Sequence, residues 1–598
     1  MKKTIISLGL LLTLASSSQM AFSEETKVVK PKKTKALELT VLHINDHHSH
    51  LESDKMSLTL DGKATTVNVG GMTRMAEEIA RLKKVSKNPL VLHAGDAMTG
   101  TLYYTLFEGV ADAKLMNKIK FDATTLGNHE FDGGNRVLKK YLTELDVPVV
   151  SANVTPDETS ELKGEWTPYI IKEIGGEKVG IIGLVVVGKT VASSNPGKDL
   201  KFEEERTATK KAVEELTAKG INKIILLSHA GYDMNVEIAK EVSGIDLIVS
   251  GDTHYLLGSQ FKEIGWNPVA DYPTQITSKD GNPVYILEAY NYNYVLGNTK
   301  VKFDAYGIIK KIEGTPEVII GDNLFQRKGA DKKDYILEGA EKESLMKYIA
   351  TKNFIKVVPE NAEAKEILST YQKEKVELGK QIVGKVEVVV PGGSENRIPN
   401  AANPNGSYAA SLVTEAFLYK LQTMGTGDVD MFLQNAGGVR TAIPAGEFSY
   451  DTGYNLLPFS NTLYVFDMTG AEIKQVMEEA IEYSTKEGGS TGGFPYGAGI
   501  RYEAKKSGEL GTRVTKVEVK DRITGEWKPL DLAKTYKIGT NSYLAGGKDG
   551  WVTFGKIKDT RGGTDTYIDY AKAFIDYVAD KKSITIPTTT NVKYDFNK

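Results

Sequence analysis

The chain has 598 residues, no cysteine and a formal net charge of -3 at pH 7. Its length predicts at least two domains with substantial cores. The lack of cysteine excludes disulfides and thiolate metal sites, and the dispersed Lys and Arg residues exclude a basic nucleic-acid groove.

The N-terminus has the features of an export signal. Lys2 and Lys3 precede an apolar run over 5–15 that is too short to span a bilayer. Ala21-Phe22-Ser23 fits a small-x-small cleavage site, so residues 1–23 are predicted to be removed. Residues 24–35 then read as a polar leader. No later apolar run predicts a membrane span, so we expect an exported protein, periplasmic or extracellular.

The first half alternates apolar strands with amphipathic helices, a pattern typical of a layered α/β domain. Helices are predicted over 72–85 and 206–219. Between about 322 and 384 the composition shifts to Lys, Glu and Ala, and one charged helix is predicted over 360–380. A second α/β segment follows from about 385. The predicted strands of the first half are 37–44, 90–94, 123–126, 148–152, 179–187, 223–228 and 246–250.

All eight histidines lie before residue 255. Most of them sit at or just beyond the C-terminal end of a predicted strand, where α/β folds place their sites. His43 and His93 lie inside their strands, and a histidine there is more often a hydrogen-bonded structural residue than a ligand. We interpret these two, together with His47 and His50, as structural.

Five strand exits carry side chains that could bind a metal ion. Carboxylates, imidazoles and an amide oxygen suit Zn, Mn, Fe or Co and do not select among them. Two divalent ions about 3.5–4 Å apart would clamp a phosphate and generate hydroxide from water at neutral pH. Asp96, alone on its strand, is suited to bridging them. The predicted ligands are Asp46, His48, Asp96, Asn128, His229, Asp252 and His254.

These strand exits resemble, in order, the motifs of calcineurin-like metallophosphoesterases. Within that superfamily the chain resembles the secreted 5′-nucleotidases and UDP-sugar hydrolases. The resemblance implies an α/β fold: a four-layer αββα sandwich over 36–340, a helical linker over 341–384 and an α/β substrate-binding domain over 385–598. The motifs are Asn45-Asp46-His47-His48, Gly95-Asp96, Gly127-Asn128-His129-Glu130-Phe131-Asp132, Ser228-His229 and Gly251-Asp252-Thr253-His254.

The resemblance also implies roles for these residues. His129, oriented by Asp132, would be the catalytic residue that stabilises the phosphoryl group. The fourth motif usually reads Gly-His-x-His, and here Asp252 replaces the first histidine, as in the NAD nucleotidase branch. The cofactors would be two divalent ions (Zn, Mn or Co), one held by Asp46, His48, Asp96 and His254 and the other by Asp96, Asn128, His229 and Asp252.

The second half carries candidate substrate residues. The run 434–440, with its glycine pair and Arg440, fits a hairpin turn with a surface arginine at least as well as a phosphate or ribose site. Phe459 and Tyr543, taken alone, fit core aromatics better than a base sandwich. The resemblance assigns them instead to a nucleoside site formed by Arg397, Asn435, Arg440, Phe459, Tyr543 and Asp549.

Three other patterns match known motifs but fail on context. Residues 183–190 match the P-loop pattern, but they read as a β-branched strand, and Asn195-Pro196-Gly197 is expected to prevent the helix that a P-loop requires. Residues 488–492 match a nucleophile elbow, yet no histidine follows residue 254. Residues 425–427 begin a dinucleotide fingerprint that fails at Asp430.

We therefore expect an exported dinuclear-metal nucleotide hydrolase. It would cleave phosphate ester and pyrophosphate bonds of NAD, NMN, AMP or UDP-sugars. Two alternatives stay open: a 2′,3′-cyclic phosphodiesterase with 3′-nucleotidase activity, which shares the metal motifs, and a nucleotide-binding protein without turnover. The filled ligand positions and His129 argue against the second alternative.

Overall fold

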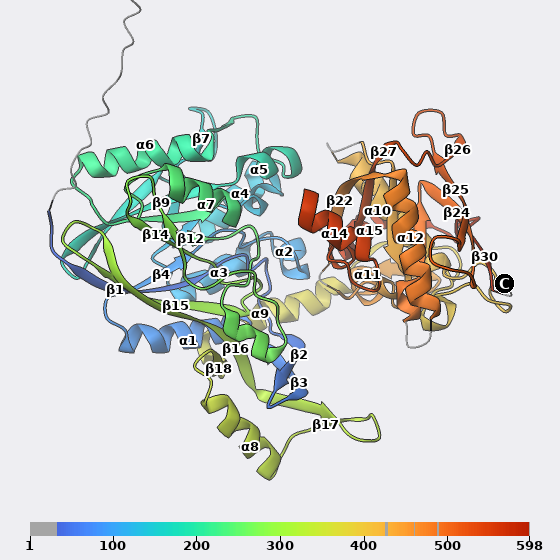
Figure 1. The fold of residues 1–598 in the computed structure, drawn as a ribbon, viewed down its shortest axis with the longest axis horizontal. Helices are drawn as coiled ribbons and strands as arrows, with labels where there is room; N and C mark the ends of the chain where they lie inside the picture. The colour runs from blue at the N-terminus through green and yellow to red at the C-terminus, as the bar shows by residue number, and fades with distance from the viewer. Residues whose placement is uncertain (1–32, 425–427, 460, 487–489, 597–598) are drawn as a thin grey trace, which may run out of the picture.

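A computed structural model describes residues 33–424, 428–459, 461–486 and 490–596. Figure 1 shows two α/β parts side by side, the first in blue to green and the second in orange to red, with helix α9 (Ala362–Gly379) between them. Residues 1–23, with the predicted signal segment, lie outside the described residues. Within the described ranges, no helix has the length and apolar character needed to cross a bilayer.

The first part is built on two sheets. The larger sheet runs β2-β3-β16-β15-β1-β4-β5-β6, with β17 and β18 also paired to β16, and its β1-β4-β5-β6 segment is parallel. Its strands are β1 (Leu37–Ile44), β2 (Asp54–Leu60), β3 (Lys63–Val69), β4 (Pro89–His93), β5 (Ala123–Thr125), β6 (Val149–Val150), β15 (Val295–Phe303), β16 (Ile309–Lys328), β17 (Asp334–Ile336) and β18 (Ile355–Val357).

The second sheet has six strands in the order β13-β14-β12-β11-β9-β8, and β14, β12, β11 and β9 are parallel. Alternate residues of β11 face opposite ways: Ile225 and Leu227 join the core shared with the first sheet, whereas Leu226 joins the core under the helices. Its strands are β8 (Tyr169–Ile174), β9 (Glu177–Val185), β11 (Ile224–His229), β12 (Leu247–Ser250), β13 (Thr274–Thr277) and β14 (Pro283–Leu287).

Helices cover the outer face of each sheet. Ile79, Leu115 and Leu138 from three helices pack in the core outside the first sheet, and Ala212 and Ile238 from two others pack outside the second. The result is an αββα sandwich, so the predicted four-layer fold is confirmed. The helices are α1 (Met72–Val85), α3 (Val110–Ile119), α4 (Gly134–Glu144), α6 (Glu205–Ala218) and α7 (Tyr232–Glu241).

The second part contains a five-stranded mixed sheet in the order β23-β20-β27-β22-β28 and a four-stranded sheet in the order β26-β25-β24-β30. The long helices α10 (Tyr408–Thr423), α12 (Gly470–Thr485), α14 (Val552–Arg561) and α15 (Tyr570–Lys581) pack with them in one core. The strands are β20 (Met431–Asn435), β22 (Thr462–Thr469), β23 (Pro495–Ala498), β24 (Ile500–Lys505), β25 (Val514–Lys520), β26 (Trp527–Pro529), β27 (Thr535–Asn541), β28 (Thr564–Asp569) and β30 (Val592–Asp595).

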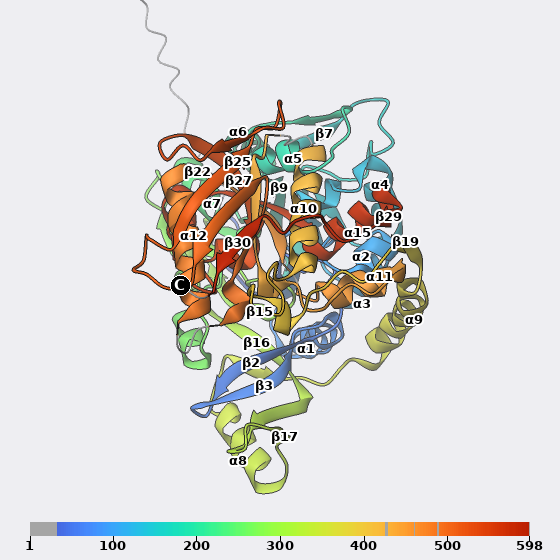
Figure 2. The same ribbon diagram turned by 90° about the vertical axis from the view of Figure 1, so that its right-hand side faces the viewer.

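The segment between the two parts is more structured than one helix. Besides α9, residues 341–384 contain most of α8 (Gly339–Ala350) and all of β18, which pairs with β16 of the first sheet. Figure 2 shows α8 and β17 projecting below both parts. The domain boundaries therefore stay a prediction.

The P-loop-like run 183–190 needs one correction. The strand β9 ends at Val185, and a short helix, α5 (Val187–Ser193), follows it. The expectation that no helix follows was wrong. Gly183 nevertheless differs in role from a P-loop glycine, because it lies at a close contact between the two sheets. A Cβ atom there would lie 2.1 Å from the carbonyl oxygen of Val150 in the first sheet. Glycine at this position lets the two sheets approach closely.

Gly183→Ala should therefore destabilise the protein, since a methyl group would push the sheets apart. We expect the free energy of unfolding to fall by about 1–3 kcal/mol, measured by denaturant titration. Gly188→Ala is the matched control, because nothing lies within 4 Å of its Cβ position on α5; it should be neutral or slightly stabilising. Equal effects of the two substitutions would contradict this explanation.

Candidate metal centre

Five of the seven predicted ligands converge at the C-terminal ends of the parallel strands, in two adjoining groups that share Asp46. Asp46, His48 and His254 form one group: the Nε2 atom of His254 lies 3.2 Å from Oδ1 of Asp46 and 3.0 Å from Nε2 of His48. Asp46, Asp96 and His229 form the other, with 3.0 Å between Nε2 of His229 and Oδ2 of Asp96. That Oδ2 atom also lies 3.7 Å from Nε2 of His48, so the Asp96 carboxylate lies between the groups.

Five predicted ligands adopt a left-handed backbone conformation. Their φ angles run from 48° to 81°, a region that costs energy for residues other than glycine. Such strain persists only where the surrounding structure enforces it, and it is concentrated at functional sites. The turn that follows each strand end thus directs the side chain back into the centre. The residues are Asp46, His48, Asp96, Asp252 and His254.

Two polar atoms of the loop after β5, Oδ1 of Asn128 and Nε2 of His129, are buried without a hydrogen-bond partner in the described residues. Oδ2 of Asp96 and Nε2 of His229 face one another as a buried ion pair. Buried polar atoms are normally satisfied. Carboxylate, amide and imidazole donors of this kind fit a divalent cation, so the residues present suit the metal ions that the sequence predicted.

Burial disfavours ionisation of the Asp96 carboxyl group, but His229, His129 and His48 outweigh it and hold its pKa well below the usual range. Asp96 is therefore a carboxylate, the form that binds metal ions. Its Oδ1 atom accepts a hydrogen bond from the backbone N–H of His129 at 2.9 Å. The residue thus connects the ligand groups to the loop that carries the predicted catalytic histidine.

Within the described part of the chain, only one ring nitrogen of His129, Nδ1, has a hydrogen-bond partner, and that partner is Asp132. Its Nδ1 atom lies 2.5 Å from Oδ2 of Asp132, while Nε2 has no partner among the described residues. Burial favours the neutral ring, but the carboxylates of Asp132, Asp96 and Glu130 outweigh it and raise the pKa of His129 to about 9. A protonated imidazole with its Nε2–H free can donate to an anionic oxygen.

Asp252 adjoins the second group. Its Oδ1 atom lies 3.9 Å from Nε2 of His229, and its backbone N–H donates to both oxygens of Asp46 at 3.1 Å. The ammonium group of Lys189 lies 2.8 Å from each oxygen of Asp252. This lysine, from the P-loop-like run, had no role in the sequence interpretation.

Glu130 is a second residue that the sequence analysis left without a role. Its buried carboxylate accepts hydrogen bonds from the backbone N–H groups of Asp96, Ala97, Met98 and Gly127, and so ties the second motif to the third. Burial and the nearby Asp96 raise its pKa to about 7. Glu288 holds the fourth motif similarly, because its carboxylate accepts from the hydroxyl groups of Ser250 and Thr253.

Tyr567, from β28 of the second part, covers the centre. Its hydroxyl donates to the backbone oxygen of Asp252 at 3.0 Å, and its ring centroid lies 4.6 Å from that of His129 and 5.9 Å from that of His48. No local pattern indicates this role, because the partner lies 315 residues away along the chain.

The histidines interpreted as structural all have protein partners. Nε2 of His43 lies 2.9 Å from the Tyr272 hydroxyl, and Nδ1 of His50 lies 3.0 Å from Oδ2 of Asp54. His47 lies between His93 and the buried Asp112, with ring nitrogens 2.9 Å and 3.1 Å from them. Each of the four is thus held by a protein group, while Nδ1 of His43 and Nε2 of His50 have no hydrogen-bond partner in the described residues.

The predicted nucleoside residues come together at the ends of β20 and β27. Oδ1 and Oδ2 of Asp549 accept hydrogen bonds from Tyr543 and Asn435, each at 3.0 Å. The Arg440 guanidinium lies 5.4 Å from the centre of the Phe459 ring. Both aromatics are exposed, at 44% for Phe459 and 43% for Tyr543, so neither is a core residue.

Arg397 belongs to the same surroundings. Its Nε atom is buried without a partner in the described residues, and burial together with the charge of Arg440 lowers its pKa. Among the interactions of the described residues, none joins these six residues to the metal centre. The metal centre instead contacts the second half through Tyr567.

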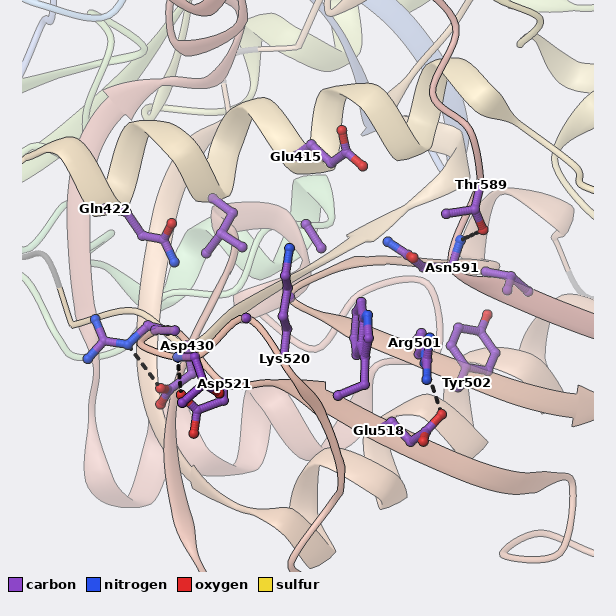
Figure 3. A pocket seen from close by; sticks show the side chains of 18 of the residues that line it. Glu415, Gln422, Asp430, Arg501, Tyr502, Glu518, Lys520, Asp521, Thr589 and Asn591 are labelled. Atoms are coloured by element: carbon purple, nitrogen blue, oxygen red, sulfur yellow. Dashed lines mark hydrogen bonds and ion pairs between the residues drawn. The ribbon is translucent and has the colours of Figure 1, made fainter.

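One large cavity belongs to neither site. It measures about 1170 Å³ and lies between α10 and the β24–β26 strands, where Arg501 pairs with Glu518 (Figure 3). Its lining mixes both signs of charge, with Lys520 and Arg501 offset by Glu415, Asp430 and Glu518. None of the predicted metal-ligand or nucleoside residues lines this cavity, so volume alone does not mark the reactive centre.

Two family models match the chain. The one described as calcineurin-like phosphoesterase matches residues 39–256, and the one described as 5'-nucleotidase, C-terminal domain, matches residues 382–556. A probable 5'-nucleotidase of Treponema pallidum is 49% identical over 558 residues, covering 93% of this chain and 94% of that protein. The NAD 5'-nucleotidase of Haemophilus influenzae is 44% identical over 572 residues, covering 94% of each.

A comparison with solved structures points to the same family as the sequence comparison. The solved NAD nucleotidase of Haemophilus influenzae matches with a TM-score of 0.84 and 43% identity, covering 94% of this chain and 100% of that one. Fold and site thus define a metal-dependent phosphoesterase. The chain belongs to the 5′-nucleotidase family, which joins this catalytic domain to the characteristic C-terminal domain. The predicted family and enzyme class are confirmed.

Glu130→Gln tests whether the four N–H bonds hold the centre together. The amide NH₂ would face N–H donors, so we expect the free energy of unfolding to fall by about 1–3 kcal/mol and metal binding to weaken. Thermal unfolding and metal analysis would measure both. The control is Glu144→Gln on α4, which removes an exposed ion pair with Lys114 of α3. It should change neither the stability nor the metal binding. Normal metal content in the Glu130 variant would contradict this role.

Proposed function

We propose that the protein is an exported dinuclear-metal nucleotide hydrolase with 5′-nucleotidase and NAD pyrophosphatase activity. The observation that carries this proposal is the convergence of five predicted ligands in two adjoining groups, together with the buried, unpartnered Oδ1 of Asn128 and Nε2 of His129. The names of the relatives support nucleotide substrates. Export rests on the sequence of residues 1–23, which lie outside the described residues.

In this proposal each ion has four ligands, and the two sets share Asp96, which lies between the two groups. Divalent ions bound there would supply Lewis-acid polarisation of the phosphoryl group and a more acidic water. The residues would be Asp46, His48, Asp96 and His254 for one ion, and Asp96, Asn128, His229 and Asp252 for the other.

His129 would act on the phosphoryl group directly. Asp132 engages Nδ1, which leaves Nε2 to donate a hydrogen bond to a phosphoryl oxygen as negative charge develops. For a 5′-nucleotide the leaving group is the ribose 5′-oxygen. For NAD or a UDP-sugar it is a phosphate oxygen.

The second half would bind the nucleoside. Phe459 and Tyr543 are exposed and available for stacking on a base, while Asp549 and Asn435 offer hydrogen-bonding groups to the nucleoside or ribose. Arg440 and Arg397 would favour a phosphate. Because Tyr567 covers His129, hydrolysis requires the halves to move relative to one another.

Incubation of the metal-reconstituted protein with NAD tests this function. Chromatography should show NMN and AMP first, and then nicotinamide riboside, adenosine and phosphate. Hydrolysis of AMP but not of NAD would restrict the proposed activity to that of a nucleoside monophosphatase. Release of phosphate from 3′-AMP but not from 5′-AMP would favour the cyclic phosphodiesterase. Inertness towards all three would contradict the proposal.

A His129→Ala variant is the control for specific turnover in that assay. It should retain its metal content while its turnover falls about a hundredfold or more, because the hydrogen bond that stabilises the developing charge on the phosphoryl oxygen is lost. Full activity would remove His129 from the mechanism and leave the metal assignment intact.

A further inference from the structure

Lys189 is placed against the metal centre by the fold. Val185, the last residue of β9, pairs with His229 of β11, and α5 then carries Lys189 past the strand end to the side chain of Asp252. In the part of the chain that the structure describes, it is the only Lys or Arg in an ion pair with a predicted metal ligand. Its side chain is 32% exposed and that of Asp252 is 4% exposed.

The contact is specific in its geometry. Both carboxylate oxygens of Asp252 lie 2.8 Å from the ammonium nitrogen. The same nitrogen lies 3.4 Å from the Tyr567 hydroxyl and 5.2 Å from the centre of its ring. The backbone of Asp252 is held separately, by Asp46 at its N–H and by Tyr567 at its carbonyl oxygen. Lys189 thus acts on the side chain alone.

The charge of the centre explains why such a partner is needed. The buried carboxylates of Asp46, Asp96 and Asp252 lie together. A histidine in place of Asp252 would be a neutral ligand and would add no negative charge. The additional negative charge opposes binding of an anionic phosphoryl group. One ammonium group at Asp252 offsets this additional negative charge, whatever divalent ions the centre holds.

We propose that Lys189 is a positioning residue that forms a functional unit with Asp252. The Lys–Asp pair takes the place of one neutral histidine. It orients the Asp252 carboxylate and keeps the centre receptive to phosphate and pyrophosphate anions. The inference rests on the proposed function, because it requires Asp252 to be a metal ligand.

A double-mutant cycle tests the pair, with Lys189→Met, Asp252→His and the double variant. Lys189→Met should raise KM for AMP and NAD about tenfold, with a smaller change in kcat, because an uncompensated carboxylate repels the substrate. Asp252→His alone should weaken Mn²⁺ binding about tenfold, because the ammonium group then has no counter-charge. The double variant should return towards the wild type in both quantities.

Mn²⁺ affinity is measured by equilibrium dialysis and metal analysis, KM and kcat by phosphate release, and folding by thermal unfolding. Lys189→Gln serves as a second variant if the methionine variant unfolds. Lys172→Met is the matched control: its ion pair with Asp122 lies elsewhere and its side chain is equally exposed, at 32%. It should leave both Mn²⁺ binding and KM unchanged.

The outcomes separate this inference from the proposed function. Additive effects in the cycle, or a Lys189→Met variant with wild-type KM and Mn²⁺ affinity, would overturn the pairing while the hydrolase stands. A wild-type protein that neither binds Mn²⁺ nor releases phosphate would overturn both. Restored KM and Mn²⁺ binding in the double variant would establish the pair.

Discussion

The buried carboxylate of Asp96 is the interaction on which the rest of the site depends. One oxygen accepts the backbone N–H of His129, and the other lies near His229 and His48. These contacts join strand ends from both sheets, so the packing of the sheets fixes the separation of the ligands. The close approach at Gly183 belongs to the same constraint, because it sets how near the second sheet lies to the first.

Much of this arrangement could be predicted from the sequence. The strand 37–44 and the helix 72–85 match β1 and α1 residue for residue, because an apolar run and a 3.6-residue periodicity are local properties. The convergence of the predicted ligands was foreseeable because they follow strand ends closely in the sequence. The strand expected over 148–152 is shorter, with only Val149–Val150 extended in the sheet.

Other features depend on contacts between distant residues and left no such pattern. Lys189 lies in a run that resembles a P-loop, and only the fold brings it to Asp252, 63 residues away. Tyr567 comes from the other half of the chain. Glu130 was visible inside its motif, but its role depends on four backbone N–H groups whose direction the sequence does not specify.

The two halves divide the work that the proposed reaction requires. The first would bind the metal ions and carries His129, and the second exposes two aromatic rings that could stack on a base, while Tyr567 covers the candidate metal centre. In this arrangement the Tyr567 ring packs edge-on against the His129 ring, with the centroids 4.6 Å apart. Motion of the halves would exchange Tyr567 for substrate.

The most direct measurement is anomalous X-ray scattering from crystals grown with Mn²⁺. The account predicts two peaks about 3.5–4 Å apart, one beside His48 and His254 and the other beside Asn128 and His229. A single peak, or peaks away from these residues, would contradict the dinuclear centre on which the proposed chemistry rests.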